Sequence, residues 1–292
     1  MVFVAFFVFY IAKVANLCYY QSEVGNMNNI YEKEKLYDFS EWTTEQPSKE
    51  NFYLHLHDEY EIFMFLKGDA KYVVEGNYYD LEPNDIIVIK KYQMHRIYHN
   101  SCTPYRRFIC MIKPAFFQAD ECQEYEEAFL NLSEKIGNKI DAETVISSGL
   151  LDIITRLKKY SESAGKYSPV TLSAMTEMLY LINNIKMNPT KNTISPRVKN
   201  IISYINNNFT KNITLDELEK RFYISKYHLC HLFPQSTGLT IHQFITKKRL
   251  ALAKDLIDSG KSISESAQLA GFNTYSSFYR AYVNEHQKPP KK

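Results

Sequence analysis

The sequence predicts an α+β protein of two domains: an N-terminal β-barrel followed by helices, and an all-α C-terminal domain with two helix-turn-helix units. Short segments rich in β-branched and aromatic residues run between residues 52 and 112. One helical pattern then occurs twice between residues 214 and 282. With 292 residues, of which 45% are hydrophobic, the chain is long enough to form a core in each domain.

The β-rich part consists of short strands separated by turn residues. Segments 52–57 and 86–89 have the composition of strands. The turn signals Gly68-Asp69, Gly76-Asn77 and Pro83-Asn84-Asp85 separate such segments. Many short strands with regular turns are typical of a barrel, which we expect to occupy residues 27–113.

The repeated helical pattern begins with a capping-box signature, Thr214-x-x-Glu217 in the first copy and Ser262-x-x-Glu265 in the second. A short helix, a turn and a second helix follow each box. The second helices have one apolar face, formed by Leu229, Leu232 and Phe233 and by Phe278, Ala281 and Tyr282. Their opposite faces carry Lys226, Tyr227, Cys230 and His231, and Tyr275, Ser276, Tyr279 and Arg280. Two matching exposed faces indicate tandem helix-turn-helix units.

The helix between the two units has an apolar stripe that changes sides. Ile241, Phe244 and Ile245 lie on one side of its first half, and Leu250, Ala253 and Ile257 lie on a side rotated by roughly 140° in its second half. We therefore expect this helix to pack on a different body at each end and to fix the two units relative to each other.

A longer set of positions extends over both units: Leu229, Leu232, Phe233, Gly238, Phe244, Arg249, Leu250, Ala253, Leu256, Ile263, Glu265, Ala267, Gly271, Phe272, Ser276, Phe278, Arg280 and Pro290. With this set, residues 197–292 resemble the DNA-binding domain of the AraC-type (AraC/XylS) transcriptional regulators. The resemblance implies that the second helix of each unit enters the major groove of DNA. It places Tyr227, Cys230, His231, Tyr275, Ser276, Tyr279 and Arg280 at base-facing positions and Lys226 near phosphate.

The sequence departs from the family pattern at several positions. Pro234 stands where the family continues its first recognition helix, and proline is expected to kink or end that helix because it has no amide hydrogen. Glu219 and Ser266 replace small or aliphatic residues, and Gln287 replaces a glycine. Pro234 leaves open an interaction module whose units no longer bind DNA.

The charges are divided unevenly between the two parts of the chain. From residue 196 onward there are 15 Lys and Arg against 7 Asp and Glu, whereas the first 195 residues have 20 against 26. A basic C-terminal third beside an acidic remainder is typical of a phosphate-binding module joined to a different domain.

Within the predicted barrel, the spacing His55-x-His57-x3-Glu61-x6-Gly68, followed by His95, resembles the small-barrel cupin domain. The resemblance implies that these side chains point inward. Three imidazoles and a carboxylate are suitable ligands for Fe, Mn, Ni or Zn, but the second cupin motif is degraded. We favour a polar lining of an effector site over structural hydrogen bonding and over a functional metal, and we expect no cofactor.

Residues 114–187 have a helical pattern, in which Leu150, Leu151, Ile154 and Leu157 and later Met178, Leu181, Ile182 and Ile185 fall at helical spacing. The family resemblance implies that such helices pack on the barrel and form a homodimer contact; a purely internal core is the alternative. Residues 188–196, which include two prolines, are expected to be a linker. Alternatively, Pro196 starts the next helix.

The first 26 residues are expected to be an extension. Residues 2–12 are apolar without interruption, but this run is shorter than the roughly 20 residues that cross a bilayer, and it lacks the basic start of a signal peptide. A buried segment and a membrane-associated leader are alternatives to an extension absent from the working protein, which we favour because a polar stretch begins at Met27. The five cysteines have no paired CxxC spacing and indicate reduced thiols in a cytoplasmic protein.

These observations predict a cytoplasmic transcriptional regulator that binds double-stranded promoter DNA and a small molecule, such as a sugar. The resemblance favours an activator, for which RNA polymerase is a further expected partner. We expect no membrane partner and no catalytic residue. The rival hypothesis is a metal-dependent cupin oxygenase or isomerase that uses His55, His57, Glu61 and His95.

Overall fold

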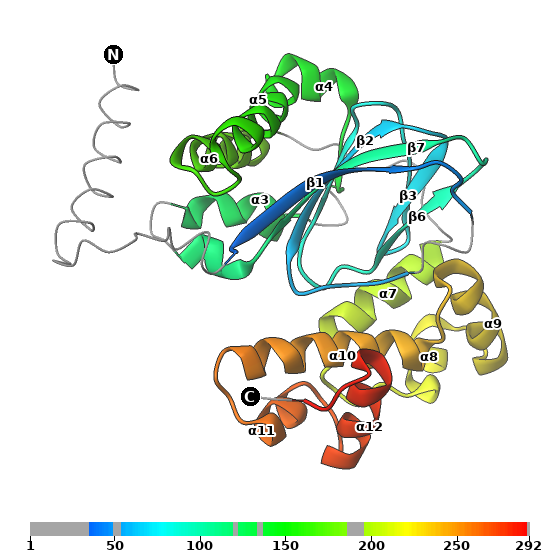
Figure 1. Ribbon diagram of the computed structural model, residues 1–292. Coiled ribbons are helices and arrows are strands. Elements are labelled where there is room, and N and C mark those ends of the chain that lie inside the picture. Colours follow the sequence, from blue (N-terminus) through cyan, green and yellow to red (C-terminus); the bar gives the residue numbers. More distant parts are fainter. Residues whose placement is uncertain (1–34, 49–53, 119–121, 133–136, 186–195, 291–292) are drawn as a thin grey trace, which may run out of the picture. The chain divides into compact units, whose positions relative to one another are not determined.

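The computed structural model describes residues 35–48, 54–118, 122–132, 137–185 and 196–290. The predicted extension of residues 1–26, and the predicted linker apart from Pro196, lie outside the described residues. Residues Leu36–Lys292 form one unit, with a β-rich N-terminal part and a helical C-terminal part (Figure 1). Within the described ranges, no helix combines the length and the apolar character that crossing a membrane requires.

Two antiparallel sheets make up the N-terminal part. The larger sheet has the order β1-β7-β2-β5-β8, with β1 at Tyr37–Thr44, β2 at Tyr60–Lys67, β5 at Ile86–Ile89, β7 at Tyr105–Ile112 and β8 at Lys139–Ile140. The smaller sheet has the order β4-β3-β6, with β3 at Ala70–Val74, β4 at Asn77–Asp80 and β6 at His95–His99. These strands confirm the predicted β-rich domain.

Side chains that alternate along the strands fill the space between the sheets. Phe63 and Phe65 of β2 belong to one buried cluster with Tyr72 of β3 and Ile97 of β6. Glu61 lies on β2 two residues before Phe63, so its side chain points to the same interior. The alternation therefore places a carboxylate at one end of an apolar core.

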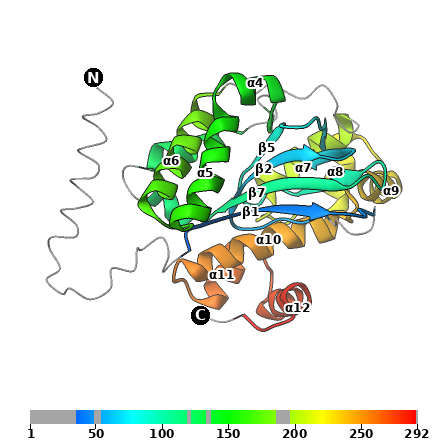
Figure 2. The same ribbon diagram turned by 45° about the horizontal axis from the view of Figure 1, so that its top comes forward.

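Helices cover the outer face of the larger sheet. They are α4 at Ala142–Ser147, α5 at Leu150–Ala164 and α6 at Pro169–Asn184, after the short segments η1 at Pro114–Gln118, η2 at Gln123–Glu126 and α3 at Glu127–Leu130. Cys110 Sγ of β7 lies 3.8 Å from Met175 Sδ of α6. The helices α5 and α6 lie side by side in two views (Figure 2), which agrees with the predicted helical segment.

Only part of the strand predicted at 52–57 is visible, because residues 49–53 lie outside the described residues. Its described end forms a single antiparallel bridge, in which His55 pairs with His95. The segment is therefore a short extension of the smaller sheet next to β6.

Six helices form the C-terminal part: α7 at Pro196–Asn208, α8 at Leu215–Phe222, α9 at Lys226–Thr237, α10 at Ile241–Asp258, α11 at Ile263–Leu269 and α12 at Tyr275–His286. Pro196 starts α7, as one of the two interpretations of its position predicted. The first half of α10 contributes Ile241, Phe244 and Ile245 to one core cluster, and its second half contributes Leu250, Ala253 and Ile257 to another. The predicted change of side along α10 is thus confirmed.

The two predicted capping boxes are only half formed. Thr214 Oγ1 accepts a hydrogen bond from the amide of Glu217 (3.2 Å), and Ser262 Oγ accepts one from the amide of Glu265 (3.2 Å). Glu217 does not return the bond, because its carboxylate accepts from the hydroxyl of Tyr204 on α7 instead. A complete capping box is found at Thr240 and Gln243, where α10 begins.

Pro234 does not end the first recognition helix. Helix α9 continues through it to Thr237, and the amide of Gly238 donates to the Pro234 carbonyl (2.8 Å). Of the two expected outcomes, a kink or an end of the helix at Pro234, the end was therefore wrong. Buried Phe233 and Thr237 on either side of Pro234 hold the last turn on the core.

Candidate functional site

The first candidate reading face lies on α9. Ser225 caps the helix by accepting from the amide of His228 (3.3 Å), and Leu229 and Phe233 are buried on the inner side. Tyr227, Cys230 and His231 are exposed on the other side, and the rings of Tyr227 and His231 lie 4.6 Å apart. The structure therefore brings these three predicted residues together on one surface.

The second candidate face lies on α12 and is built in the same way. Thr274 caps the helix by accepting from the amide of Ser277 (3.1 Å), and Phe278 and Tyr282 anchor it in the core. Exposed residues occupy the outer side, namely Tyr275, Ser276, Tyr279 and Arg280. The Arg280 guanidinium donates a hydrogen bond from Nε to the Ser276 carbonyl (3.4 Å), and the side chain is exposed and accessible to a partner.

Lys226 differs from the other predicted contacts because it is already paired. Its ammonium lies 2.6 Å from the carboxylate of Asp216 on α8, and this ion pair raises the pKa of Lys226. Its backbone amide donates to Glu219 (3.2 Å). The Glu219 carboxylate, a departure from the family pattern, thus stabilises the N-terminus of α9, where a negative charge is favourable.

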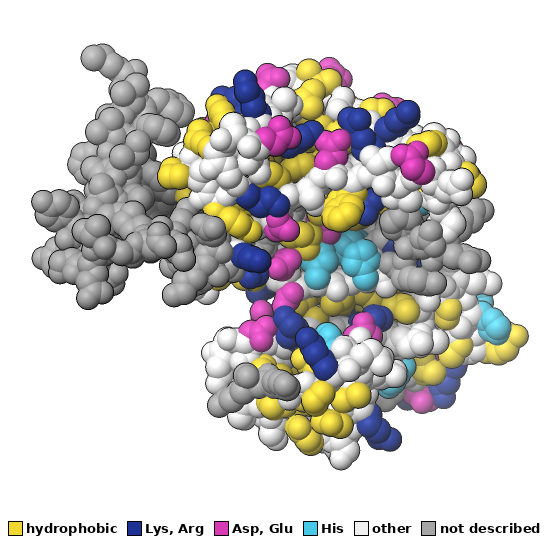
Figure 3. Space-filling view, viewed as in Figure 1, with side chains coloured by type: hydrophobic (Ala, Val, Ile, Leu, Met, Phe, Trp, Pro, Cys, Tyr) yellow, Lys and Arg dark blue, Asp and Glu magenta, His cyan; other side chains and the backbone are white. Residues whose placement is uncertain are grey.

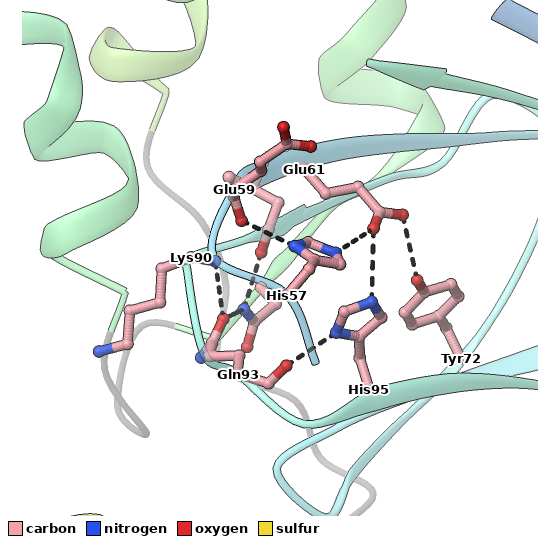
Figure 4. A network of polar contacts seen from close by, with 9 residues as sticks. His57, Glu59, Glu61, Tyr72, Lys90, Gln93 and His95 are labelled. Atoms are coloured by element: carbon pink, nitrogen blue, oxygen red, sulfur yellow. Dashed lines mark hydrogen bonds and ion pairs between the residues drawn. The ribbon is translucent and has the colours of Figure 1, made fainter. Parts of the chain in front are cut away.

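A second candidate site lies in the barrel, where His57, Glu61 and His95 meet (Figure 4). His57 Nε2 lies 2.9 Å and His95 Nε2 lies 3.3 Å from the same oxygen, Glu61 Oε2. His55 joins them, with its ring centroid 4.2 Å from that of His95. Histidine side chains also reach the surface in the middle of the face seen in Figure 3, between the barrel and the C-terminal helices. All four predicted residues are therefore brought together.

The backbone determines which nitrogen of each ring carries a proton. His57 Nδ1 lies 2.8 Å from the carbonyl of Glu59, and His95 Nδ1 lies 2.8 Å from the carbonyl of Gln93. A carbonyl only accepts, so both Nδ1 atoms carry hydrogen. In a neutral ring the Nε2 lone pair would then face the Glu61 carboxylate, which is repulsive. The arrangement at His57 requires positive charge at Nε2, from a proton or from a bound cation.

The electrostatics of the pair agree with this requirement. Burial alone would lower the pKa of His57, but the hydrogen bond and the charge of Glu61 raise it above its usual value. Burial would likewise raise the pKa of Glu61, but the hydrogen bond from His57 and the close approach of the His95 ring hold it well below its usual range. Glu61 is therefore a buried carboxylate anion.

The same residues fit a transition-metal ion. One ring nitrogen from each of His55, His57 and His95 lies within 4.8 Å of the other two, and Glu61 supplies a carboxylate oxygen beside them. His95 Nε2 is buried and has no well-formed hydrogen bond. Histidines that donate Nδ1–H to a carbonyl are typical of metal sites. A bound ion would supply Lewis-acid character, and these four residues would hold it.

We expect added Zn²⁺ to bind at this cluster. With free Zn²⁺ at about 100 times its Kd, the free energy of unfolding should rise by about 2.7 kcal/mol, which a thermal melt with and without Zn²⁺ measures. His57→Ala should abolish the gain because it removes one ligand. His242→Ala, which removes an exposed histidine on α10, should leave it intact. Equal gains in both variants would contradict a site at this cluster.

Two residues near these sites were missed from the sequence. The Tyr72 hydroxyl donates to Glu61 Oε1 (3.4 Å). Tyr72 alternates with Val74 on β3, and this pattern in the sequence indicated that the Tyr72 side chain points into the core. Tyr223 is 93% exposed in the turn between α8 and α9, in a left-handed conformation with φ of 53°. A large exposed aromatic side chain in this turn lies beside the first reading face.

Comparison with known sequences gives two family matches. Residues 43–169 match the AraC-like ligand binding domain, and residues 218–292 match a helix-turn-helix domain. The chain is 26% identical over 231 residues to the probable transcriptional regulator LumQ of Photobacterium leiognathi, covering 78% of this chain and 86% of that one. It is 19% identical over 243 residues to the transcriptional activator RhaS of Escherichia coli, covering 81% and 85%.

Comparison with solved structures gives a match of similar extent. A crystal structure of ToxT from Vibrio cholerae is 15% identical, with a TM-score of 0.37, and the match covers 88% of this chain and 96% of that chain. The sequence matches thus extend over both the barrel and the helical part.

Proposed function

The chain belongs to the AraC/XylS family of transcriptional regulators, with a ligand-binding domain and a DNA-binding helix-turn-helix domain, and from this we propose that it activates transcription in response to a small polar molecule such as a sugar. The observation that carries the proposal is the pair of exposed faces on α9 and α12, each held by a capped and core-anchored helix. The regulator would act in the cytoplasm on double-stranded promoter DNA.

The residues of the two faces have chemistry suited to the major groove. Arg280 is able to donate two hydrogen bonds to a guanine, and His231 is able to donate one to a base acceptor. The exposed tyrosines would contact thymine methyl groups or phosphate. Lys226 would reach phosphate by exchanging its ion pair with Asp216 for a contact with DNA. We propose that Tyr227, Cys230, His231, Tyr275, Ser276, Tyr279 and Arg280 line the DNA interface.

Arg280→Ala tests this proposal. The preference for the chain's own promoter over random DNA should fall by about 1–3 kcal/mol, because a guanine contact is lost. Fluorescence anisotropy across a salt series measures it, since a steep salt slope reports the remaining phosphate contacts. Arg156→Ala is the matched control, because Arg156 is also an exposed arginine and lies on α5, outside the helix-turn-helix units. An unchanged preference in Arg280→Ala would contradict the proposed reading face.

We propose that the effector binds at His55, His57, Glu61 and His95. A buried carboxylate and several imidazoles are able to accept and donate hydrogen bonds to the hydroxyl groups of a sugar. The ligand would act by binding one arrangement of the domains more tightly than another. RhaS, a relative over most of the chain, is named as an activator, which supports activation. Contact with RNA polymerase is proposed as part of that role.

A homodimer is also proposed. The helical segment after the barrel exposes apolar side chains at Ile146, Val170 and Tyr180. Exposed apolar residues on α4 and α6 are suited to a contact with a second copy. A dimer would present four helix-turn-helix units to the promoter.

The rival enzyme hypothesis rests on the same histidine cluster, whose donors fit a catalytic metal. The relatives are transcriptional regulators, and this favours sensing over turnover. Zn²⁺ binding without turnover would be compatible with the sensing role, in which the ion would help to hold an effector.

A further inference from the structure

One stretch of the barrel lies between the histidine cluster and the C-terminal helices. It consists of residues 54–58 with Met94 and His95, and we call it the shared wall. His55 and His95 pair through two backbone hydrogen bonds of 3.1 and 2.9 Å. In such a pair, successive side chains point to opposite sides of the backbone.

The two sides of the shared wall have different neighbours. On one side, His55, His57 and His95 form the histidine cluster. On the other, Met94 is buried in a hydrophobic cluster against which Leu54 and Leu56 pack. The remaining members of this cluster belong to the first helix-turn-helix unit and its flanking helices, including Val198, Ile202, Phe233 and Phe244. A single backbone layer thus separates the histidines from the core of the DNA-binding domain.

A buried ion pair attaches the shared wall to α10. Lys248 is 5% exposed, and its ammonium lies 2.5 Å from Glu75, in the turn between β3 and β4. The same carboxylate accepts from the amide of Met94 (2.8 Å) and from the side-chain amide of Asn206 on α7 (2.7 Å). Glu75 therefore joins α7, α10 and the residue next to His95.

Two further contacts run from α10 to the histidine side. Lys248 also donates to the carbonyl of Tyr92, whose amide donates to the carbonyl of His57 (2.9 Å). Lys254 pairs with Asp58, the neighbour of His57 in the sequence. Displacement of His57 would thus affect two ion pairs of α10. It would reach the Lys248–Glu75 pair through Tyr92, and the Lys254–Asp58 pair directly through the neighbouring Asp58.

We infer that the shared wall is a regulatory contact, through which occupation of the histidine cluster changes the docking of α7 and α10 and so the placement of both reading faces. The inference rests on the proposed effector site and specifies how it reaches DNA. Coupling between sites is reciprocal, so a change at Lys248 must alter the histidines, and a change at His57 must alter α10.

The first arm of the test replaces Lys248 by Met in the full chain. We expect new imidazole resonances for His55, His57 and His95 in NMR spectra, and amide hydrogen exchange about five-fold or more faster in residues 54–58. The double variant Glu75→Gln/Lys248→Met removes both charges. It shows whether the effect of Lys248→Met comes from the lost contact or only from leaving the Glu75 carboxylate buried and unpaired. Lys261→Met, which breaks an exposed ion pair with Glu265, is the matched control. Unchanged resonances in both Lys248 variants would overturn the inference.

The second arm changes a residue of the histidine cluster and measures the response in the C-terminal helices. His57→Ala should speed hydrogen exchange in α7 and α10 by about five-fold or more, whereas His228→Ala, at an exposed position on α9, should not. Exchange that rises only around residue 57 would overturn the inference. Promoter binding by the unmodified chain is measured separately. The histidine cluster could prove to be coupled to α7 and α10 in a chain that does not prefer its promoter over random DNA. That result would refute the proposed function but not the coupling.

Discussion

Gly271→Ala should lower the free energy of unfolding of the C-terminal domain by at least about 3 kcal/mol, a loss that places it among the largest single-residue effects. Gly271 has a φ of 93° in the turn between α11 and α12. A Cβ atom there would lie 2.3 Å from the Thr210 carbonyl oxygen and 2.7 Å from its carbon. Both neighbours are backbone atoms just after α7, so the helices must move apart to relieve the clash. Urea unfolding followed by circular dichroism measures the loss.

Gly260→Ala separates the clash from the cost of the backbone conformation. Gly260 has a similar φ of 96°, but a methyl group at this position would have no atom of the described chain within 4 Å. The substitution should cost only about 1–2 kcal/mol, the strain of an alanine in a left-handed conformation. Equal losses in the two variants would show that the approach of Thr210 contributes nothing.

Pro234→Ala should have the second largest effect, in the opposite direction. Pro234 lies inside α9, where it cannot donate to the carbonyl of Cys230 four residues earlier. Alanine restores that hydrogen bond and is up to about 3 kcal/mol more favourable than proline in a helix interior. We therefore expect a higher urea midpoint for the C-terminal domain.

Gln235→Ala is the matched control for this gain, because Gln235 is the exposed neighbour in the same helix and should change stability by less than about 0.5 kcal/mol. A loss of stability in Pro234→Ala would mean that the proline restrains the unfolded chain more than it disturbs the helix. Promoter binding by the same variant also bears on the hypothesis of a module that no longer binds DNA, since Pro234 is its basis.

The periodic parts of the fold were predictable from the sequence. The predicted apolar positions of α9, α10 and α12 lie in the two helical core clusters or pack against them, because helical spacing decides which side of a helix faces a core. The histidine site was predicted from the resemblance to the cupin domain. His55 and His57 lie one residue apart next to a single bridge, and Glu61 and His95 lie on β2 and β6.

The remaining features depend on contacts between distant residues. Glu217 was predicted to complete a capping box, but Tyr204 takes its carboxylate. Glu75 and Lys248 are 173 residues apart, and each alone resembles an ordinary surface charge. Their pairing follows from the docking of α10 on the barrel, which no local pattern encodes.

The length of α10 bears on the layout of the promoter. Its 18 residues span about 27 Å, about four fifths of one turn of B-DNA at about 34 Å. The two ends of this helix are embedded in separate cores. A rigid helix, and not a flexible linker, therefore sets the distance between the two reading faces. Under the proposed function, the two DNA segments that the faces contact would therefore keep a constant spacing and phase. Mutations that insert or delete a few base pairs between them would be as damaging as changes in the segments themselves.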